Sequence, residues 1–176
     1  AGLVGPKVVN YLSRGKTDTT RLQVEQIAAA LDLFLLDVGR YPTEEEGMEA
    51  LVEELSPFVG RFKVGKESFT RFGPEVVALV REHGAGVFLD LKYHDIPNTV
   101  HGAARAATEL GVAMFNVHAA GGRAMMTAAM EGVREAEPDA EMAPKVIAVT
   151  VLTSIDQETL NQECGVPGPL SQQVLG

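Results

Sequence analysis

Residues 86–99 read GVFLDLKYHDIPNT, a short apolar run that passes into a dense set of charges and then a proline. Side chains alternate between the two faces of a strand, so Asp90 and Lys92 are expected on one face and the neighbouring leucines on the other. The Ile96-Pro97 step then ends the strand. The stretch therefore predicts a strand over residues 86–93 whose carboxyl end carries acidic and basic side chains.

Three further apolar runs of the same kind lie on either side of this one, at residues 60–65 (GRFKVG), 112–119 (VAMFNVHA) and 145–152 (KVIAVTVL). Each is short and rich in Val, Ile, Phe or Leu, as expected of strands buried on both faces. Between the strands, apolar residues recur three or four positions apart, which predicts helices over residues 74–83, 99–110 and 123–136. Alternating strands and helices indicate βα units and hence a parallel sheet with right-handed crossovers.

The number of units limits the size of this sheet. The chain has 176 residues, which suggests one domain, or one domain with a short appendage. A closed eight-stranded βα barrel usually takes ~250 residues. Four clear strands therefore predict an α/β protein that holds about half of such a barrel.

Composition excludes several classes of function. The chain has 15 Lys and Arg residues against 24 Asp and Glu, for a net charge of −9, which argues against nucleic acid as the main partner. A locally basic pocket for one phosphate stays open. The single Cys164 excludes an intramolecular disulfide and is interpreted as an inert thiol, and no Cys/His cluster has zinc spacing. No apolar run approaches the ~20 residues that span a bilayer.

Residues 1–46 follow a different pattern. Apolar side chains at helical spacing predict an amphipathic helix over residues 19–36, which ends before Gly39 and Pro42. This helix is expected to pack against another element and to have no catalytic role.

This first segment carries a resemblance of its own. The strings GLVGPKVVNYL (2–12) and AALDLFLLDVGRYPTEEEGMEALVE (29–53) resemble the major pseudopilin of type II secretion systems, with DVGRYPT (37–43) as the most specific piece. The resemblance implies an origin for residues 1–50, not a working pilus subunit, and it implies a membrane link only through that origin. Because the chain starts like the tail of a longer apolar segment, we do not expect a natural amino terminus.

The charged residues form a candidate site before any family is considered. Asp90, Lys92 and Asp95 make an acid–base–acid series at the carboxyl end of a predicted strand, and Lys63 ends the strand before it. Barrel enzymes place catalysis at the carboxyl ends of parallel strands. A buried ion pair that only positions a loop is the structural alternative. The convergence of these charges favours a functional site.

The string DLKYHDIPNT matches Asp-x-Lys-x-x-Asp-Ile-Pro-Asn-Thr, the hallmark of the orotidine 5′-phosphate decarboxylase family. The surrounding chain resembles the family as well, in RFKVGKESFTRFGPE (61–75) for the second strand and its helix, MFNVHAAGG (114–122) for the fourth strand and VIAVTVLTSID (146–156) for the fifth. The resemblance covers residues 51–176. It implies a partial (β/α)8 TIM barrel of about strands 2–5, preceded by the amphipathic helix, and a metal-free, cofactor-free enzyme that converts orotidine 5′-phosphate to UMP.

The resemblance also implies roles for the hallmark residues. Lys92 would donate the proton to C6 of the pyrimidine, and Asp90 would lie against the substrate carboxylate and orient Lys92. Asp95, accompanied by Thr99, would reach into the site of the neighbouring subunit and contact the ribose. The resemblance therefore implies a homodimer.

Further candidates come from the flanking strands. By resemblance, Lys63 would bond the ribose and the Asp pair, and Ser154 would bond the pyrimidine edge. Ser154 has an alternative role as a helix cap ahead of Gln157 and Glu158. The family has Ala-Leu-Asp on its first strand; here LFLLDVG takes that place, so Asp37 is the substitute candidate, although the local pattern favours helix.

Two other sets of residues have simpler interpretations. His118, at the end of the fourth strand of the family pattern, either lines the pocket or is a hydrogen-bonded core histidine, and the second interpretation is favoured. Three methionines at helical spacing are interpreted as core residues: Met125, Met126 and Met130.

Three hypotheses for the function remain open at this point. The first is a decarboxylase with little or no activity, because the family's phosphate-binding loops follow strands that the sequence lacks. The second is a non-catalytic chimera, joined near residues 49–55 (EALVEEL), a string that either family accommodates as helix. The third is a related barrel lyase that uses a metal, which the DIPNT continuation disfavours. The decarboxylase part implies a cytoplasmic location, whereas relatives of the first segment are found in the inner membrane and periplasm.

Overall fold

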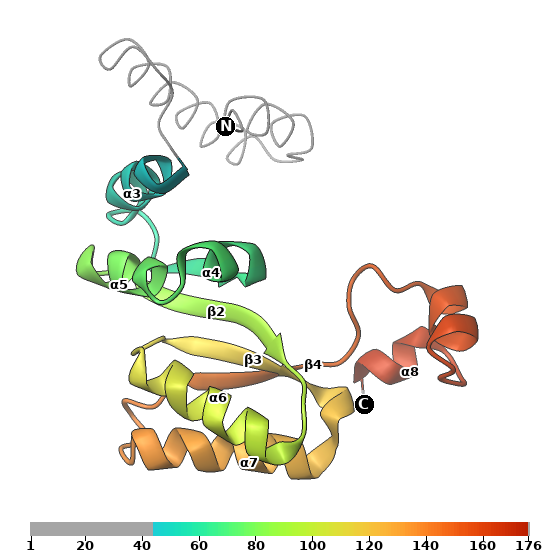
Figure 1. Cartoon of the computed structure of the whole chain (residues 1–176). Coiled ribbons are helices and arrows are strands. Elements are labelled where there is room, and N and C mark those ends of the chain that lie inside the picture. Colours follow the sequence, from blue (N-terminus) through green and yellow to red (C-terminus); the bar gives the residue numbers. More distant parts are fainter. Residues whose placement is uncertain (1–43, 176) are drawn as a thin grey trace. The chain divides into compact units, whose positions relative to one another are not determined.

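The computed structural model describes residues 44–175 (Figure 1). The chain divides between Val59 and Gly60 into two compact units. In the first unit the structure describes helix α3 (Glu44–Leu55), which includes the string at residues 49–55 that both resemblances allow as helix. The helix predicted over residues 19–36 and the candidate Asp37 lie outside the described residues.

The second unit contains a four-stranded sheet built from the four predicted runs. Its strands are β1 (Arg61–Gly65), β2 (Gly86–Tyr93), β3 (Met114–His118) and β4 (Lys145–Val149). They are ordered β1-β2-β3-β4, and every neighbouring pair is parallel. Consecutive parallel neighbours joined by right-handed crossovers place their helices on one face and all carboxyl ends at one edge. The predicted α/β fold, consistent with a partial TIM barrel, is confirmed.

The helices between the strands also match the prediction closely. Helices α5 (Glu75–Glu82), α6 (Pro97–Glu109) and α7 (Gly122–Ala136) agree with the predicted ranges to within two residues. Helix α6 begins at Pro97 because the fixed φ of proline suits the first helical position and its missing N–H is not needed there.

Four shorter helical elements lie outside the ranges predicted from periodicity, although the resemblance of residues 61–75 implied a helix after the second strand and Ser154 was considered as the cap of a later helix. Helix α4 (Lys66–Phe72) precedes α5, and Gly73, at φ +64°, separates the two helices in a conformation that favours glycine. The others are a 3₁₀ turn (Ala119–Gly121), a π-helical turn (Thr159–Glu163) and α8 (Leu170–Leu175).

The core of the second unit lies on the inner strands and the helices that cover them. The most deeply buried strand residues are Val87, Leu89, Phe115 and Val117, each nearly inaccessible to solvent. Burying a side chain of this kind contributes about 1.5–3 kcal/mol. Valines of α5 and small or branched residues of α6 and α7 complete the core: Val76, Val77, Val80, Val100, Ala104, Ala107, Ala129 and Val133.

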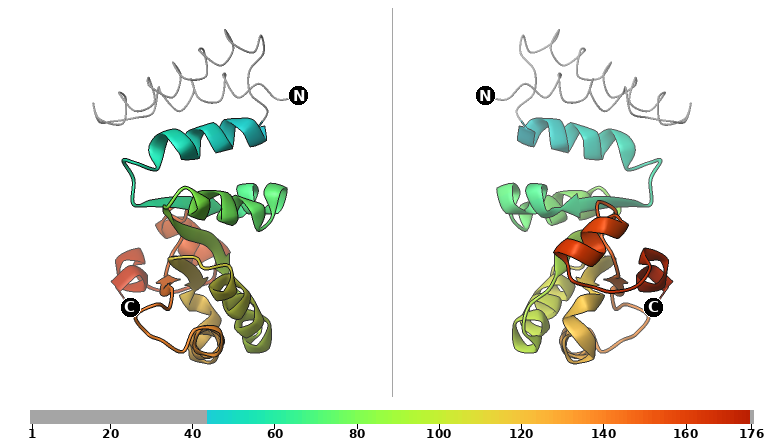
Figure 2. Two further views of the ribbon diagram at one scale, coloured as in Figure 1. Left: turned by 90° about the vertical axis from the view of Figure 1, so that its left-hand side faces the viewer. Right: turned by 90° about the vertical axis from the view of Figure 1, so that its right-hand side faces the viewer.

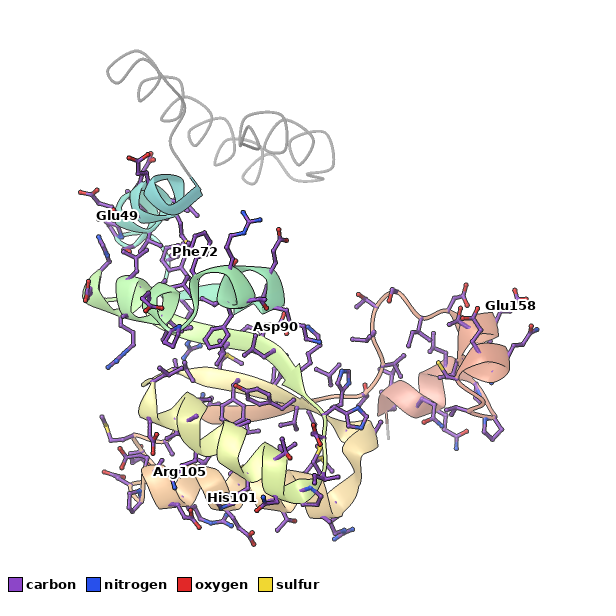
Figure 3. The ribbon with its side chains drawn as sticks, viewed as in Figure 1. Glu49, Phe72, Asp90, His101, Arg105 and Glu158 are labelled. Carbon is purple, nitrogen blue, oxygen red and sulfur yellow. The ribbon has the colours of Figure 1, made fainter. Side chains whose placement is uncertain are left out.

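Helices α6 and α7 lie side by side in all views (Figures 1 and 2). Gly132 of α7 allows this approach, because a Cβ there would overlap the backbone carbonyl oxygen of His101 in α6. His101 also contacts α7, with 3.2 Å between its Nε2 and Oε1 of Glu135. His101 and Arg105 both lie on α6 (Figure 3), and Arg105 pairs within that helix with Glu109 at 3.0 Å. The two helices therefore form a closely packed layer on the sheet.

The outer strands differ from the prediction of burial on both faces. In β1 only Val64 is fully buried, and in β4 no residue is, with Ile147 40% exposed. β1 and β4 are the edge strands of the described sheet, so each has a neighbouring strand on one side only. The prediction of double-sided burial is right for the middle of β3, right only in part for β2, where Val87, Leu89 and Asp90 are buried, and wrong for β1 and β4.

Three smaller expectations can be compared with the structure. Met125 is buried as predicted, Met126 is half-buried, and Met130 is exposed, so the core interpretation is wrong for Met130. Cys164 is an exposed free thiol. Within residues 44–175 no helix has the length and apolarity needed to cross a membrane.

Candidate active site

A break in the strand register shapes the carboxyl end of β2. Leu89 pairs with Phe115 of β3, and the next pair joins Tyr93 to Val117. Three residues of β2 therefore lie opposite a single residue of β3, Asn116, which is a bulge in β2. The last of the three is Lys92.

Lys92 has a left-handed backbone within this bulge. Its φ of +52° is the one positive value of a non-glycine residue in the described part of the chain. Such a conformation costs on the order of 1–3 kcal/mol and persists where the surrounding structure imposes it, often at functional sites. The sequence pattern had predicted a regular alternating strand here.

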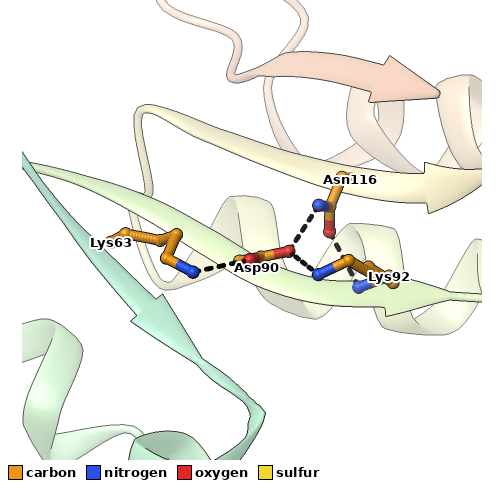
Figure 4. Close-up of polar contacts among 4 residues, drawn as sticks. All are labelled: Lys63, Asp90, Lys92 and Asn116. Atoms are coloured by element: carbon orange, nitrogen blue, oxygen red, sulfur yellow. Dashed lines mark hydrogen bonds and ion pairs between the residues drawn. The ribbon is translucent and has the colours of Figure 1, made fainter. Parts of the chain in front are cut away.

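The Asp90 carboxylate lies between two lysine ammonium groups (Figure 4). Nζ of Lys92 is 2.5 Å from Oδ1, and Nζ of Lys63 on the neighbouring strand β1 is 3.1 Å from Oδ2. The Asp90 side chain is 11% exposed and that of Lys92 26%, whereas that of Lys63 is 61% exposed. Solvent therefore screens the Lys63 pair, which contributes little, about 0–1 kcal/mol. The Asp90–Lys92 pair is the tight, partly desolvated one.

Asn116 is the fourth member of this group, and the sequence analysis did not include it. Its Nδ2 donates to Asp90 Oδ1 at 2.6 Å, and its Oδ1 accepts from the backbone N–H of Lys92 at 2.7 Å (Figure 4). The residue is 2% exposed. A signal was present in the sequence: Asn116 is an amide in the middle of the apolar run MFNVH, and a buried amide needs hydrogen-bond partners.

The electrostatics of the group favour an ionised Asp90. Burial alone would raise its pKa, but hydrogen bonds from Lys92, Asn116 and Lys63, together with the charge of Lys92, outweigh burial and hold the pKa well below its usual range. At neutral pH Asp90 is therefore a carboxylate, and it lies between the side chains of two lysines.

Two histidines lie at the same edge of the sheet. The rings of His94 and His118 are 5.3 Å apart between centroids. Desolvation lowers the pKa of His118, and the charges of His94, Lys66 and Lys92 lower it further. His118 is only half-buried and packs against another ring, so the interpretation as a hydrogen-bonded core histidine is wrong.

Two of the predicted site residues lie outside this group. Asp95 is exposed, and its Oδ1 accepts from the backbone N–H of Ile96 at 2.6 Å. Thr99 is exposed in the first turn of α6. No hydrogen bond or ion pair among residues 44–175 joins either side chain to Asp90 or Lys92. Their predicted position in a neighbouring subunit stays a prediction.

Ser154 follows β4 and is exposed. The helical turn after it is capped by another residue: the Asp156 Oδ1 accepts from the backbone N–H of Thr159 at 2.8 Å. This hydrogen bond lowers the pKa of Asp156. The alternative role of Ser154 as the cap is therefore wrong, and its predicted role in binding stays a prediction.

The arrangement supports a limited set of reactions. In the part of the chain that the structure describes, no three His, Cys, Asp or Glu side chains gather where they could hold a metal ion. The ammonium of Lys92 uses one of its hydrogen bonds on Asp90 and is still partly exposed, so it can approach a bound anion. A fixed ammonium stabilises developing negative charge and can then donate a proton to it.

A parallel βα sheet with a lysine–aspartate–lysine group at its carboxyl edge defines a site of the βα-barrel enzyme class. Residues 25–175 match the model of the orotidine 5′-phosphate decarboxylase / HUMPS family, and the chain belongs to this family. Orotidine 5′-phosphate decarboxylase of Moorella thermoacetica is 52% identical over 151 residues, which cover 85% of this chain and 56% of the relative. That of Halorhodospira halophila is 56% identical over 127 residues, or 72% of this chain and 52% of the relative.

Solved structures of similar sequence also have a similar fold. Orotidine 5′-phosphate decarboxylase from Lactobacillus acidophilus is 40% identical, with a TM-score of 0.65 over 72% of this chain and 58% of that one. An uncharacterised conserved protein from Geobacillus kaustophilus is 44% identical, with a TM-score of 0.69 over 76% of this chain and 62% of that one.

The matches show how much of a full-length relative the chain spans, and they include part of the segment that resembles a pseudopilin. The chain spans about half the length of the curated relatives it matches, 56% for the Moorella protein. The family match starts at residue 25 and so includes half of the segment 1–50 that resembles a pseudopilin. The division of the chain near residue 50 stays a prediction.

Proposed function

We propose that the chain carries the proton-donating part of an orotidine 5′-phosphate decarboxylase site and converts orotidine 5′-phosphate to UMP. The observation that carries the proposal is the Asp90 carboxylate held between Lys92, at 2.5 Å, and Lys63, at 3.1 Å, at the carboxyl edge of the sheet. Family membership supports it, because relatives that bear this name are more than 50% identical to the chain.

The chemical step needs one proton donor and no cofactor. The bond between C6 of the pyrimidine and the carboxylate breaks, CO₂ leaves, and the electron pair stays on C6. The ammonium of Lys92 stabilises that pair electrostatically and then transfers a proton to C6, after which solvent reprotonates the amine. Asp90 holds the ammonium in place through its hydrogen bond with Lys92 Nζ.

The remaining residues are proposed to bind the substrate. Lys63 would bond the ribose, because its side chain is mostly exposed while its terminal nitrogen also contacts the Asp90 carboxylate. Ser154 would bond the pyrimidine edge. Asp95 and Thr99 would act across a homodimer interface; both are exposed and unattached to the Asp90 group, as such a role requires. No nucleic acid partner is proposed, and the proposed location is the cytoplasm.

The test is a spectrophotometric assay that follows loss of orotidine 5′-phosphate absorbance with the purified chain. Lys92→Ala should lower kcat/KM by at least about 10³-fold, because it removes both the charge and the proton. The matched control is Lys145→Ala, which removes an exposed lysine from the same sheet and should leave kcat/KM unchanged.

Equal rates for the parent and Lys92→Ala would refute the role of Lys92. A folded parent chain without turnover would refute the proposed activity and favour the non-catalytic alternative. The expectation of little or no activity for this chain remains a prediction that the same assay measures.

A further inference from the structure

Asn116 connects the two charged residues of β2 from the neighbouring strand. Its Nδ2 donates to the carboxylate of Asp90, and its Oδ1 accepts from the backbone N–H of Lys92. The donor and the acceptor of this buried amide thus both bond to the three-residue bulge of β2, at its first and its last residue. The Asn116 side chain is almost inaccessible to solvent, so water does not compete for either contact in the parent chain.

The position of Asn116 opposite the bulge explains why a side chain is needed there. Three residues of β2 face this one residue of β3, so the regular ladder is interrupted between the pairs Leu89–Phe115 and Tyr93–Val117. The Lys92 N–H points to the Asn116 side chain across this gap. A left-handed lysine that costs on the order of 1–3 kcal/mol needs such an external support.

We propose that Asn116 is a positioning residue that fixes the Lys92 backbone in its left-handed conformation and the Asp90 carboxylate in its orientation. The effect of this positioning on catalysis rests on the proposed function. The contacts of Asn116 with Asp90 and with the Lys92 N–H can be tested without any turnover. A displacement of about 1 Å at a reacting group can cost ~10²-fold in rate. Asn116 touches neither the substrate nor the reacting atoms in this proposal and acts only through Asp90 and Lys92.

The Asn116 amide supplies its donor and its acceptor on two separate atoms, one for Asp90 and one for the Lys92 N–H. Asn116→Ala removes both contacts. Asn116→Asp keeps an acceptor for the Lys92 N–H but turns the donor into a second carboxylate against Asp90, where two like charges raise one pKa strongly. The two variants therefore separate the contact with Lys92 from the contact with Asp90.

The first measurement is by NMR on the full chain and uses amide hydrogen exchange at Lys92 and the carboxyl titration of Asp90. In Asn116→Ala, exchange at Lys92 should become about tenfold faster, the effect of losing one hydrogen bond of about 1.4 kcal/mol, and the Asp90 midpoint should rise. In Asn116→Asp, exchange at Lys92 should stay slow while a carboxyl group titrates at higher pH than Asp90 does in the parent.

Thr108→Val is the matched control, because it removes another buried hydrogen bond, the 2.9 Å bond from Thr108 Oγ1 to the Ala104 carbonyl in α6. It should lower global stability without changing either NMR signal. If Lys92 exchange and the Asp90 midpoint change no more in Asn116→Ala than in Thr108→Val, the proposal is wrong. If Asn116→Ala does not fold, the carboxyl titration of Asn116→Asp tests the proposal instead. An Asp90 titration midpoint equal to that of the parent would show that Asn116 does not hold the Asp90 carboxylate.

The second measurement is the steady-state assay. Asn116→Ala should lower kcat about 10²-fold and change KM by less than about threefold, since the reacting group and not the binding groups is displaced. Thr108→Val should retain the parent kcat. An unchanged kcat in an active Asn116→Ala variant would overturn the catalytic consequence. An inactive parent would refute the proposed function, and the NMR result would still decide the role of Asn116.

Discussion

Strands β2 and β4 were predicted from the same pattern, and they differ sharply in the structure. At the end of β2, Asp90 is buried and bonded to Lys63, Lys92 and Asn116. After β4, Ser154 is exposed, and β4 itself has no fully buried residue. A strand pattern with a polar residue at its carboxyl end is therefore not enough to define a site. The partners on the neighbouring strands of β2 make the difference.

The largest expected effect concerns the acid in the centre of the β2 group. Asp90→Ala leaves the Lys92 ammonium without its main partner, so we expect kcat/KM to fall by at least about 10³-fold. Glu163→Ala, at the exposed π-helical turn, is the control and should change kcat/KM by less than about twofold. Steady-state kinetics of the parent, Asp90→Ala and Glu163→Ala measure kcat/KM for each. A mild loss in Asp90→Ala would show that Lys92 is positioned without this carboxylate.

A second prediction compares the cores of the two strands. Leu89→Ala in β2 should lower the free energy of unfolding by about 2–5 kcal/mol, because the side chain is fully buried. Ile147→Ala in β4 should cost about 1 kcal/mol or less, because Ile147 is 40% exposed. Urea denaturation followed by circular dichroism measures both values. Equal losses would mean that β4 is covered in solution, for example by a second copy of the chain.

A third prediction follows from the depressed pKa of Asp90. A carboxyl group with a lower pKa in the folded state than in the unfolded state adds stability above its unfolded pKa of about 3.9. That stability is lost as the pH falls below about 4 towards the folded pKa. The difference in free energy of unfolding between the parent and Asp90→Asn should therefore be constant from pH 7 to pH 5 and shrink at lower pH. A difference that does not depend on pH would contradict the assigned shift.

The smallest effect is expected at Ser154. Its side chain is exposed, so Ser154→Ala should change the free energy of unfolding by less than about 0.5 kcal/mol. Through its proposed bond with the pyrimidine edge it should raise KM by up to about tenfold and leave kcat nearly unchanged. Substrate titrations of the parent and the variant measure this. An unchanged KM would remove Ser154 from the proposed site.

The parallel sheet and the gathering of charged residues at its carboxyl edge could be predicted from the sequence pattern, whereas the contact of Lys63 with Asp90 was implied only by the family resemblance. Apolar runs alternate with helical patterns, and parallel strands bring their carboxyl ends to one edge, so local rules were sufficient. The exposure of β4 was not predictable from its apolar run, because burial depends on what lies beside a strand and not on the strand itself.

The bulge in β2 and the role of Asn116 could not be predicted for a related reason. Both depend on the register between β2 and β3, two strands whose contacting residues are 24 and 26 positions apart in the chain. Hydrophobic patterning indicates which face of a strand is buried. A bulge in which three residues of one strand lie opposite one residue of the next leaves no periodic signal in the sequence. Likewise, Ser154 and Asp156 both suit a helix start by composition, and the hydrogen bond from Thr159 assigns the cap to Asp156.

The central claim is that the ammonium at position 92 carries the chemistry. Its most direct test is to remove this ammonium and put it back: Lys92→Cys, assayed for orotidine 5′-phosphate turnover before and after aminoethylation, which builds a lysine-like ammonium on the new thiol. The exposed Cys164 is alkylated as well, so the parent treated in the same way is the control. We expect Lys92→Cys to lose at least about 10³-fold in kcat/KM and aminoethylation to restore at least about tenfold, with the parent unaffected. No recovery in a folded, fully alkylated variant, or a rate in Lys92→Cys equal to that of the parent, would contradict the account.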